Sequence, residues 1–234
     1  MSFGNGWYPV ALAGDVEPGQ SAGTQLFDRE FCIWRDADGC PHAWEDRCPH
    51  RGMRLSFGFV RGDRIACLYH GWQYDKHGQC RLIPSHPDLD VPPTIHVTAY
   101  PSIDWLGILW VNSDARVETP PDLIIDPHDV VPVRSLYIDC MPAAALQLLA
   151  ANSKNIGSAG VTLLSIDAKG QNLIAGVQPF GKAKTALHIV LPGTPDKYHP
   201  TARSAAAIWA EELRRDLEQE SVSSMASAFS EAAP

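Results

Sequence analysis

The sequence predicts a mostly β protein with a β-sandwich in its N-terminal part. The C-terminal part is expected to be α+β, an antiparallel sheet followed by a helix. Many short strand-like runs alternate with Gly- and Pro-rich turn signals from Gly6 to Asp114. Three more strand-like runs lie between residues 161 and 191, and an Ala-rich segment with helical periodicity begins at Thr201.

Two hairpins and one buried strand are expected in the N-terminal part. The first hairpin joins residues 31–35 to 41–44 across a turn that contains an Asp-Gly pair. The second follows the strand 73–75 and turns at 76–79. Residues 108–111 are all apolar, so we expect a buried strand that closes this region.

A segment rich in Pro and acidic residues separates the two parts of the chain. We predict a linker or extended crossover at 115–135 between a domain at 1–114 and a domain at 136–234. A surface loop inside a single domain is the alternative. In the C-terminal part, a strand and a short helix are expected within 136–151, followed by strands at 161–167, 172–179 and 185–191.

The last segment is predicted to be a helix over 201–220, with Thr201 as its N-cap and a fraying tail at 221–234. One apolar stripe is expected along it, formed by Trp209, Leu213 and Leu217. Its Ala-rich surface at 204–217, and the apolar surface at 141–151, would permit association.

Composition and charge exclude several classes of protein. The 234 residues are 45% hydrophobic and 20% charged, enough for a core without disulfides. A net charge of −8 argues against binding to nucleic acid or to an anionic membrane, because both reward clustered Lys and Arg. Neither a signal peptide nor an apolar run of membrane-spanning length is visible, so a cytoplasmic location is expected.

Two short motifs carry the chemistry. They read Cys48-Pro49-His50-Arg51-Gly52 and Cys67-Leu68-Tyr69-His70-Gly71-Trp72, with sixteen residues between His50 and Cys67. Each offers one thiolate and one imidazole from a tight loop, as a Rieske-type [2Fe–2S] cluster requires, with the two Cys on one iron and the two His on the other. A Cys₂His₂ zinc site is the alternative, but C-x-H spacing is too short for the usual zinc pattern.

These motifs and their flanks resemble the Rieske domain of the non-haem iron oxygenases that hydroxylate rings or remove methyl groups. The resemblance covers about residues 6–114. It includes Gly6-Trp7-Tyr8-Pro9-Val10, the run 51–55 and the Tyr74-Asp75-x-x-Gly78 hairpin. It implies a Rieske β-sandwich, with His50 and His70 on the outer iron. It also implies a reductase or ferredoxin as electron donor, and an oligomer. The chain's acidity would suit a basic redox partner.

The remaining cysteines do not suggest a disulfide clamp. High-potential Rieske proteins carry an extra Cys in each loop, whereas this chain has Met53 and the Leu68-Tyr69 pair there. The oxygenase-type centre is therefore favoured. The other thiols have no partner by spacing and are expected to be ordinary buried or half-buried groups: Cys32, Cys40, Cys80 and Cys140.

The resemblance also implies a mononuclear iron held by two His and one carboxylate. Its His pair would fall in 150–157, which contains no His, and none of the later histidines forms a close pair: His77, His86, His96, His128, His188 and His199. We therefore expect a reduced oxygenase-type domain in which mononuclear Fe(II) is absent. Electrons would then pass to iron on a partner oxygenase subunit.

Two alternatives stay open. A non-standard iron site would make the chain a complete monooxygenase or dioxygenase; its ligands would come from His128, His188, His199, Asp126 and Asp196. Alternatively, the chain is a non-catalytic assembly protein in which the cluster is structural.

Three residues near the proposed ligands have expected supporting roles. Arg51 is expected to hydrogen-bond an acidic or carbonyl group, or else to form a surface salt bridge. Tyr69 and Trp72 are expected to shield the cluster and to lie on the electron path, with simple packing as the alternative for Trp72.

Overall fold

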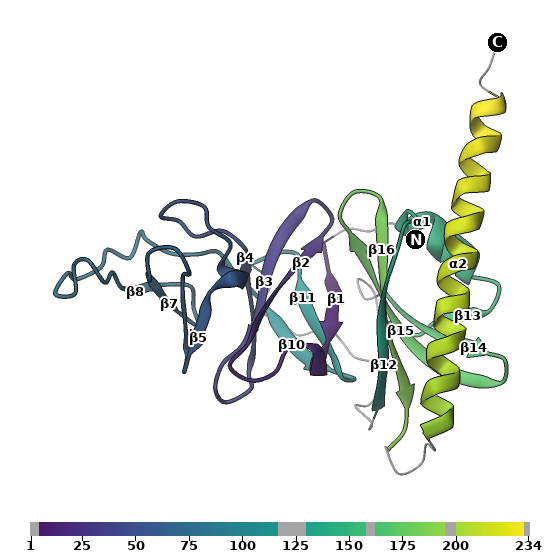
Figure 1. Ribbon diagram of the computed structural model, residues 1–234, viewed down its shortest axis with the longest axis horizontal. Helices are drawn as coiled ribbons and strands as arrows, with labels where there is room; N and C mark the ends of the chain where they lie inside the picture. Colours follow the sequence, from purple (N-terminus) through teal and green to yellow (C-terminus); the bar gives the residue numbers. More distant parts are fainter. Residues whose placement is uncertain (1–4, 117–129, 158–161, 195–199, 232–234) are drawn as a thin grey trace.

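The computed structural model describes residues 5–116, 130–157, 162–194 and 200–231. Figure 1 shows a row of layers, with a small lobe at one end, strands in the middle, and a sheet covered by helices at the other end. No helix in these described ranges is both long and apolar enough to cross a membrane. The predicted mostly β class, with an α+β C-terminal part, is confirmed.

Residues 5–116 form three antiparallel sheets, ordered β1-β11-β10, β2-β3-β4-β9 and β5-β6-β7-β8. Their strands are β1 Trp7–Leu12, β2 Ser21–Leu26, β3 Arg29–Arg35, β4 Pro41–Glu45, β5 Phe59–Arg61, β6 Arg64–Ala66, β7 Gln73–Asp75, β8 Cys80–Leu82, β9 Ala99–Tyr100, β10 Ser102–Trp105 and β11 Ile108–Asn112. Two 3₁₀ helices, η1 Ala13–Asp15 and η2 Leu55–Phe57, lie between them. Both predicted hairpins are present, and β11 is buried along its whole length.

The second part is a five-stranded antiparallel sheet ordered β12-β16-β15-β14-β13. Its elements are β12 Val130–Ile138, α1 Pro142–Leu149, β13 Ser153–Asn155, β14 Leu163–Ala168, β15 Gln171–Phe180, β16 Lys184–Pro192 and α2 Pro200–Glu231. The three strands predicted between 161 and 191 are all found. β12 begins inside the segment predicted as a linker, while 117–129 lie outside the described residues; the domain division stays a prediction.

The central strands β15 and β16 are apolar on both faces because both faces are covered. On one face Leu173, Val177 and Ile189 share a core with α1 and α2. On the other, Ile174 and Val190 pack with aromatic residues of the β1-β11-β10 sheet. A continuous apolar run is the pattern expected of a strand buried on two sides.

The C-terminal helix differs from the prediction at both ends. It begins at Pro200, one residue before the predicted N-cap, and continues to Glu231, so the tail predicted to fray is helical to that residue. The segment 221–231 contains neither Gly nor Pro, the residues that most often end a helix. The predicted stripe is confirmed at Leu217, which is buried, with Trp209 and Leu213 partly buried beside it.

The apolar segments expected to permit association are only partly used within the chain. Ala145 and Leu149 of α1 lie in one core with Ala206, Ala210 and Leu217 of α2. Met141 and Ile208, in the same two segments, are 57% and 62% exposed. That 141–151 and 204–217 permit association with a second copy therefore stays a prediction.

A buried polar chain joins the two parts. Gln178 on β15 is fully buried, and its Nε2 donates to the Gln25 carbonyl (2.7 Å) and to Thr24 Oγ1 (3.0 Å) of β2. Gln178 Oε1 is 2.8 Å from His188 Nε2, and His188 Nδ1 is 2.9 Å from Ser135 Oγ. Since both ring nitrogens of His188 are engaged, its role in this structure is to hold β16 to its neighbours.

Burial lowers the pKa of His188 to about 3, so its folded form is neutral. Unfolded His takes up a proton below about pH 6.5, and the stability that depends on neutral His188 is therefore lost as pH falls from that value toward 3. We expect the wild-type chain to lose about 2 kcal/mol more than His188→Gln between pH 7 and pH 5. Urea unfolding at the two pH values measures the difference. His86→Gln, which removes an exposed His, should keep the wild-type pH dependence, and equal losses in His188→Gln and wild type would contradict the assignment.

Candidate metal centre

The two motifs form two copies of one tight loop. The first follows β4: Cys48 N–H donates to Met53 O (2.8 Å), and Gly52 N–H donates to Cys48 O (2.8 Å). The second follows β6 and repeats both bonds, from Cys67 to Trp72 (2.9 Å) and from Gly71 to Cys67 (3.0 Å). Gly52 and Gly71 have φ of 72° and 70°, a conformation that favours glycine, so each motif needs its glycine to close the loop.

The loops bring the four predicted ligands together. Cys48 and Cys67 are each only 3% exposed, His50 is half-buried and His70 is exposed. The rings of His50 and His70 lie 4.6 Å apart between centroids. Burial raises the pKa of the Cys67 thiol, and the neighbouring Cys48 raises it further. The two sulfurs are thus inside the lobe and the two imidazoles at its rim.

One buried atom tests whether this site fits a metal cluster. Nδ1 of His50 is buried and has no hydrogen-bond partner among the described residues. A buried ring nitrogen without a partner lowers the stability of the folded chain. A metal ion that accepts its lone pair removes this cost. Two thiolates and two imidazoles are the donor set of a Rieske centre, where each iron takes only two protein ligands. Among the described residues, no group of three or more His, Cys, Asp or Glu side chains is placed so that it could hold a single metal ion.

Each imidazole has an aromatic neighbour. Trp72 stacks on His50, with centroids 4.3 Å apart and planes 4° from parallel. Tyr69, which is 56% exposed, lies 3.8 Å from His70 between centroids. The structure therefore brings both predicted shielding residues to the imidazoles. Arg51, by contrast, is exposed and makes neither of its predicted contacts with the residues that the structure describes.

Tyr74 is a site residue that the sequence analysis missed. Its hydroxyl is 3.1 Å from Cys48 Sγ, and the side chain is fully buried in the core of the lobe. Burial, then the neighbouring Cys48, raises the pKa of Tyr74, so the hydroxyl keeps its proton and can donate it to a thiolate. The available signal was its position on β7 only two residues after Trp72, but a strand Tyr more often fills a core.

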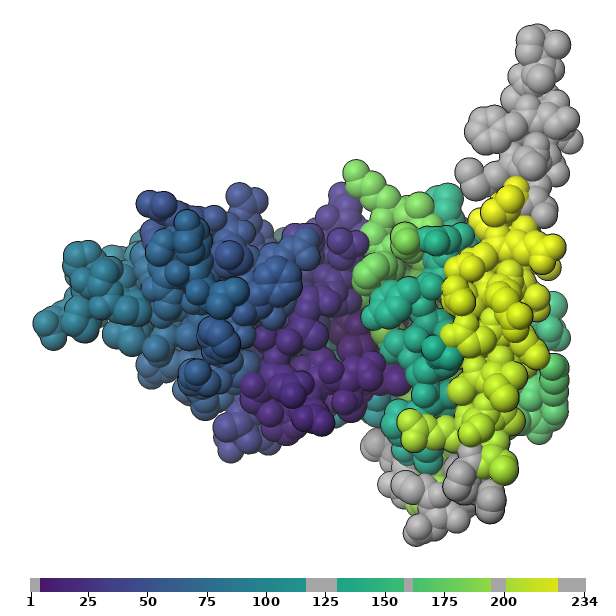
Figure 2. Space-filling view, viewed as in Figure 1, coloured from purple at the N-terminus to yellow at the C-terminus, as the bar shows by residue number. Residues whose placement is uncertain are grey.

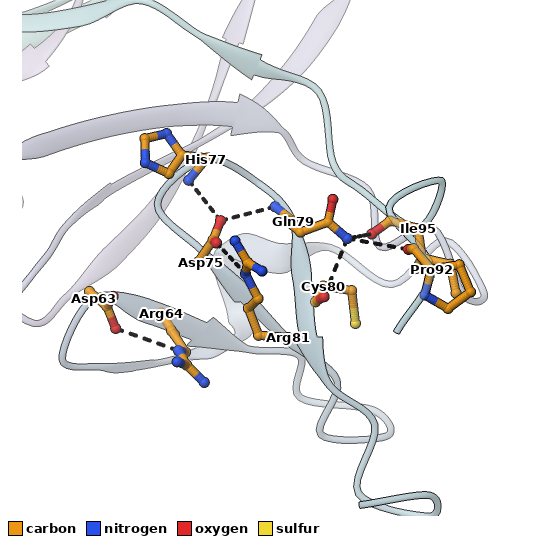
Figure 3. Close-up of polar contacts among 9 residues, drawn as sticks. All are labelled: Asp63, Arg64, Asp75, His77, Gln79, Cys80, Arg81, Pro92 and Ile95. Atoms are coloured by element: carbon orange, nitrogen blue, oxygen red, sulfur yellow. Dashed lines mark hydrogen bonds and ion pairs between the residues drawn. The ribbon is translucent and has the colours of Figure 1, made fainter. Parts of the chain in front are cut away.

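The hairpin that follows the second loop is held by a carboxylate. Asp75 accepts from the N–H groups of His77 (2.9 Å) and Gln79 (3.1 Å), and from Arg81 Nε (2.6 Å) (Figure 3). Burial opposes ionisation, yet these hydrogen bonds lower the pKa of Asp75. Gln79 Nε2 also donates to Ile95 O (3.1 Å), which ties the hairpin to the chain before β9. β7, and with it Tyr74, is therefore fixed in place.

The histidines of the second half are not brought into a metal site. Residues 150–157, where the resemblance would place a His pair, include the strand β13 and contain no His. His188 is committed to Gln178 and Ser135. The other members of the alternative site lie outside the described residues: His128, His199, Asp126 and Asp196.

Comparison with known proteins gives the family of the N-terminal part. Residues 6–101 match the Rieske [2Fe-2S] domain family. The oxidoreductase NdmD of Pseudomonas putida is 34% identical over 132 residues, which are 56% of this chain and 22% of NdmD. The 4beta-methylsterol monooxygenase of Methylococcus capsulatus is 39% identical over 112 residues, 46% of this chain and 30% of that protein. The chain thus spans less than a third of the length of these two relatives.

Solved structures match more of the chain. Dicamba monooxygenase with non-heme iron and dicamba has a TM-score of 0.75 at 17% identity, covering 98% of this chain and 90% of that chain. NdmA of Pseudomonas putida CBB5 has a TM-score of 0.68 at 18% identity, covering 91% and 80%. These likenesses show a shared fold across both parts. Residues 6–101 therefore form a Rieske domain, which implies a [2Fe–2S] cluster, and the proteins that the chain resembles include several named as monooxygenases.

Proposed function

We propose that this chain is the Rieske electron-transfer component of a non-haem iron oxygenase system. Cys48 and Cys67 would hold the inner iron, and His50 and His70 the outer one. When bound, the cluster supplies reversible one-electron transfer. The reductase or ferredoxin that reduces it, and the partner subunit whose mononuclear iron receives the electron, belong to the same proposal.

The geometry of the two loops supports electron transfer at the imidazole edge of the site. The sulfurs are buried, whereas the exposed edge is made by His70 and, in part, His50. An electron therefore has its shortest way into and out of the site through the imidazoles. Trp72 and Tyr69 lie against these rings and exclude water from one face of each.

The observation that carries the proposal is the contrast between the two parts. The N-terminal loops provide a complete donor set, while residues 150–157 form an edge strand and a turn without a His. We propose that 1–114 and 136–234, joined through 115–135, act as a Rieske domain and a reduced oxygenase-type domain. The cytoplasm is the proposed location.

Iron counting tests the proposal directly. We expect two irons and two acid-labile sulfides per reconstituted chain, because only the Rieske pair of sites would be filled. The variants His128→Ala and His199→Ala should keep two irons. A third iron in the wild-type chain, lost in either variant, would favour the complete-oxygenase alternative, which the fold shared with dicamba monooxygenase also supports. Elemental analysis with a sulfide assay gives the count.

The assembly-protein alternative makes a different prediction. A structural cluster has no need to cycle, whereas an electron carrier must be reduced and reoxidised without loss. We expect a reversible one-electron titration followed by the visible spectrum. Irreversible bleaching on the first reduction would favour the structural role.

A further inference from the structure

The segment that contains the candidate metal centre does not share the net negative charge of the chain. Residues 45–98, which contain both loops and β5–β8, hold seven Lys and Arg against six Asp and Glu, a net +1. Since the whole chain carries −8, the remainder carries −9. Charges are screened over about 8 Å at physiological ionic strength, so a protein docking at the loops responds mainly to the charges near them. The lobe is the free end of the molecule, opposite α2 (Figure 2).

Three of the six acids of this segment are engaged within the lobe, one by hydrogen bonds and two by ion pairs. Asp46 is buried and accepts from the N–H and hydroxyl of Ser56, at 2.7 and 2.6 Å. Asp63 pairs with Arg64 and Asp75 with Arg81. The acids that have neither an ion pair nor a side-chain hydrogen bond among the described residues are Glu45 on β4, and Asp88 and Asp90 on the connection from β8 to β9.

Two arginines beside His50 remain uncompensated. Arg47 and Arg51 are exposed, and no carboxylate among the described residues lies within 4 Å of either guanidinium. Both line a groove of about 300 Å³ that also reaches His50, Glu45 and His96. Elsewhere in the lobe Arg54, Arg64 and Arg81 each have a carboxylate partner. A carboxylate of a partner protein that enters the groove could therefore pair with two arginines that have no carboxylate partner among the described residues.

The second loop adds an apolar surface to the same rim. Leu68 is 48% exposed and Tyr69 is 56% exposed, next to the exposed His70. A small apolar area flanked by unpaired charge suits a short-lived complex, since the charge steers the encounter and the apolar contact expels water.

We propose that an acidic one-electron carrier protein docks on this rim, defined as Arg47, Arg51, Leu68 and Tyr69. Its carboxylates would contact the two arginines, and its cofactor would face His70. One electron leaves the reduced carrier and reduces the cluster, and no atom is transferred. The inference deepens the proposed function by giving the charge of the donor, which is opposite to the charge that the chain's net −8 suggests.

Binding of two oppositely charged probes to the oxidised, cluster-loaded chain tests this surface. The probes are an oxidised acidic plant-type ferredoxin and a basic cytochrome c, at 50 and 300 mM NaCl, measured by biolayer interferometry. We expect the chain to bind the ferredoxin more tightly, with affinity falling as salt rises. Arg47→Gln/Arg51→Gln should bind ferredoxin about fivefold more weakly at low salt, because rim charges act mainly on association.

Arg61→Gln/Lys76→Gln is the matched control. It removes the same charge from exposed residues of the same lobe that lie at hairpin turns, and it should bind ferredoxin within twofold of wild type. An equal visible spectrum in all three proteins verifies that the cluster is loaded. Tighter binding of cytochrome c, or equal losses in the two double variants, would overturn the proposal. Because binding is measured without an oxygenase, a third iron in the chain would refute the proposed function and leave this result standing.

Discussion

Replacing His70 with Ala is expected to abolish the visible absorption of the cluster. His70 is one of only two imidazoles in the loops, and a single His cannot complete the coordination of the outer iron. Metal-site binding energy is also folding energy, so the lobe should lose thermal stability when the cluster cannot form. The spectrum of the anaerobically reconstituted variant, with a thermal scan followed by circular dichroism, measures both effects.

His77→Ala is the control for this substitution. His77 is exposed in the same lobe, and its contribution to the Asp75 hydrogen bonds is made by its backbone N–H, which Ala retains. This variant should keep the full spectrum. An intact spectrum in His70→Ala would refute the ligand assignment, because it would mean that another group completes the site.

Tyr74→Phe is expected to lower the reduction potential of the cluster without removing it. The hydroxyl lies 3.1 Å from Cys48 Sγ, and reduction adds negative charge that such a hydrogen bond stabilises. If the bond is stronger by about 1 kcal/mol in the reduced state, its loss lowers the potential by about 40 mV for a one-electron couple. A spectroelectrochemical titration gives this value directly.

The matched control is Tyr69→Phe, which deletes the same hydroxyl from an exposed ring beside His70. We expect its potential to stay near that of wild type, since none of the described contacts links its hydroxyl to a sulfur. Deleting a buried hydroxyl changes little volume, so Tyr74→Phe should fold and load normally. A potential unchanged in Tyr74→Phe would show that the hydroxyl does not tune the cluster.

The ligand set could be predicted from the sequence because metal chemistry acts through local spacing. A C-x-H and a C-x-x-H, each followed by Gly, define two loops whose hydrogen bonds close within a few residues, as the bonds of Cys48 and Cys67 show. Strands and hairpins were predictable for the same reason, since alternation and turn residues are local features. The largest boundary differences are at the start of β12, which lies inside the segment predicted as a linker, and at the end of α2, where 221–231 contain neither Gly nor Pro.

Contacts between distant segments were not predictable in this way. The Tyr74 hydroxyl meets Cys48 only because β7 packs behind the first loop, 26 residues earlier in the chain. His188 looked available as a metal ligand until the sheet placed Gln178 and Ser135 at its two nitrogens. Ala145 and Leu149 of α1 share a core with α2, a contact that the local pattern of neither helix contains.

The sequence by itself determined the chemistry of this protein: which four side chains can hold a cluster, and which residues close the loops that carry them. Only the tertiary structure decided how that cluster is surrounded. It placed a buried hydroxyl 3.1 Å from one sulfur, left His70 exposed, and left Arg47 and Arg51 without carboxylate partners among the described residues. The physical reason is the sequence distance over which each kind of interaction acts. Coordination and turn geometry are set over a few residues, whereas burial and charge compensation depend on segments that meet only after folding.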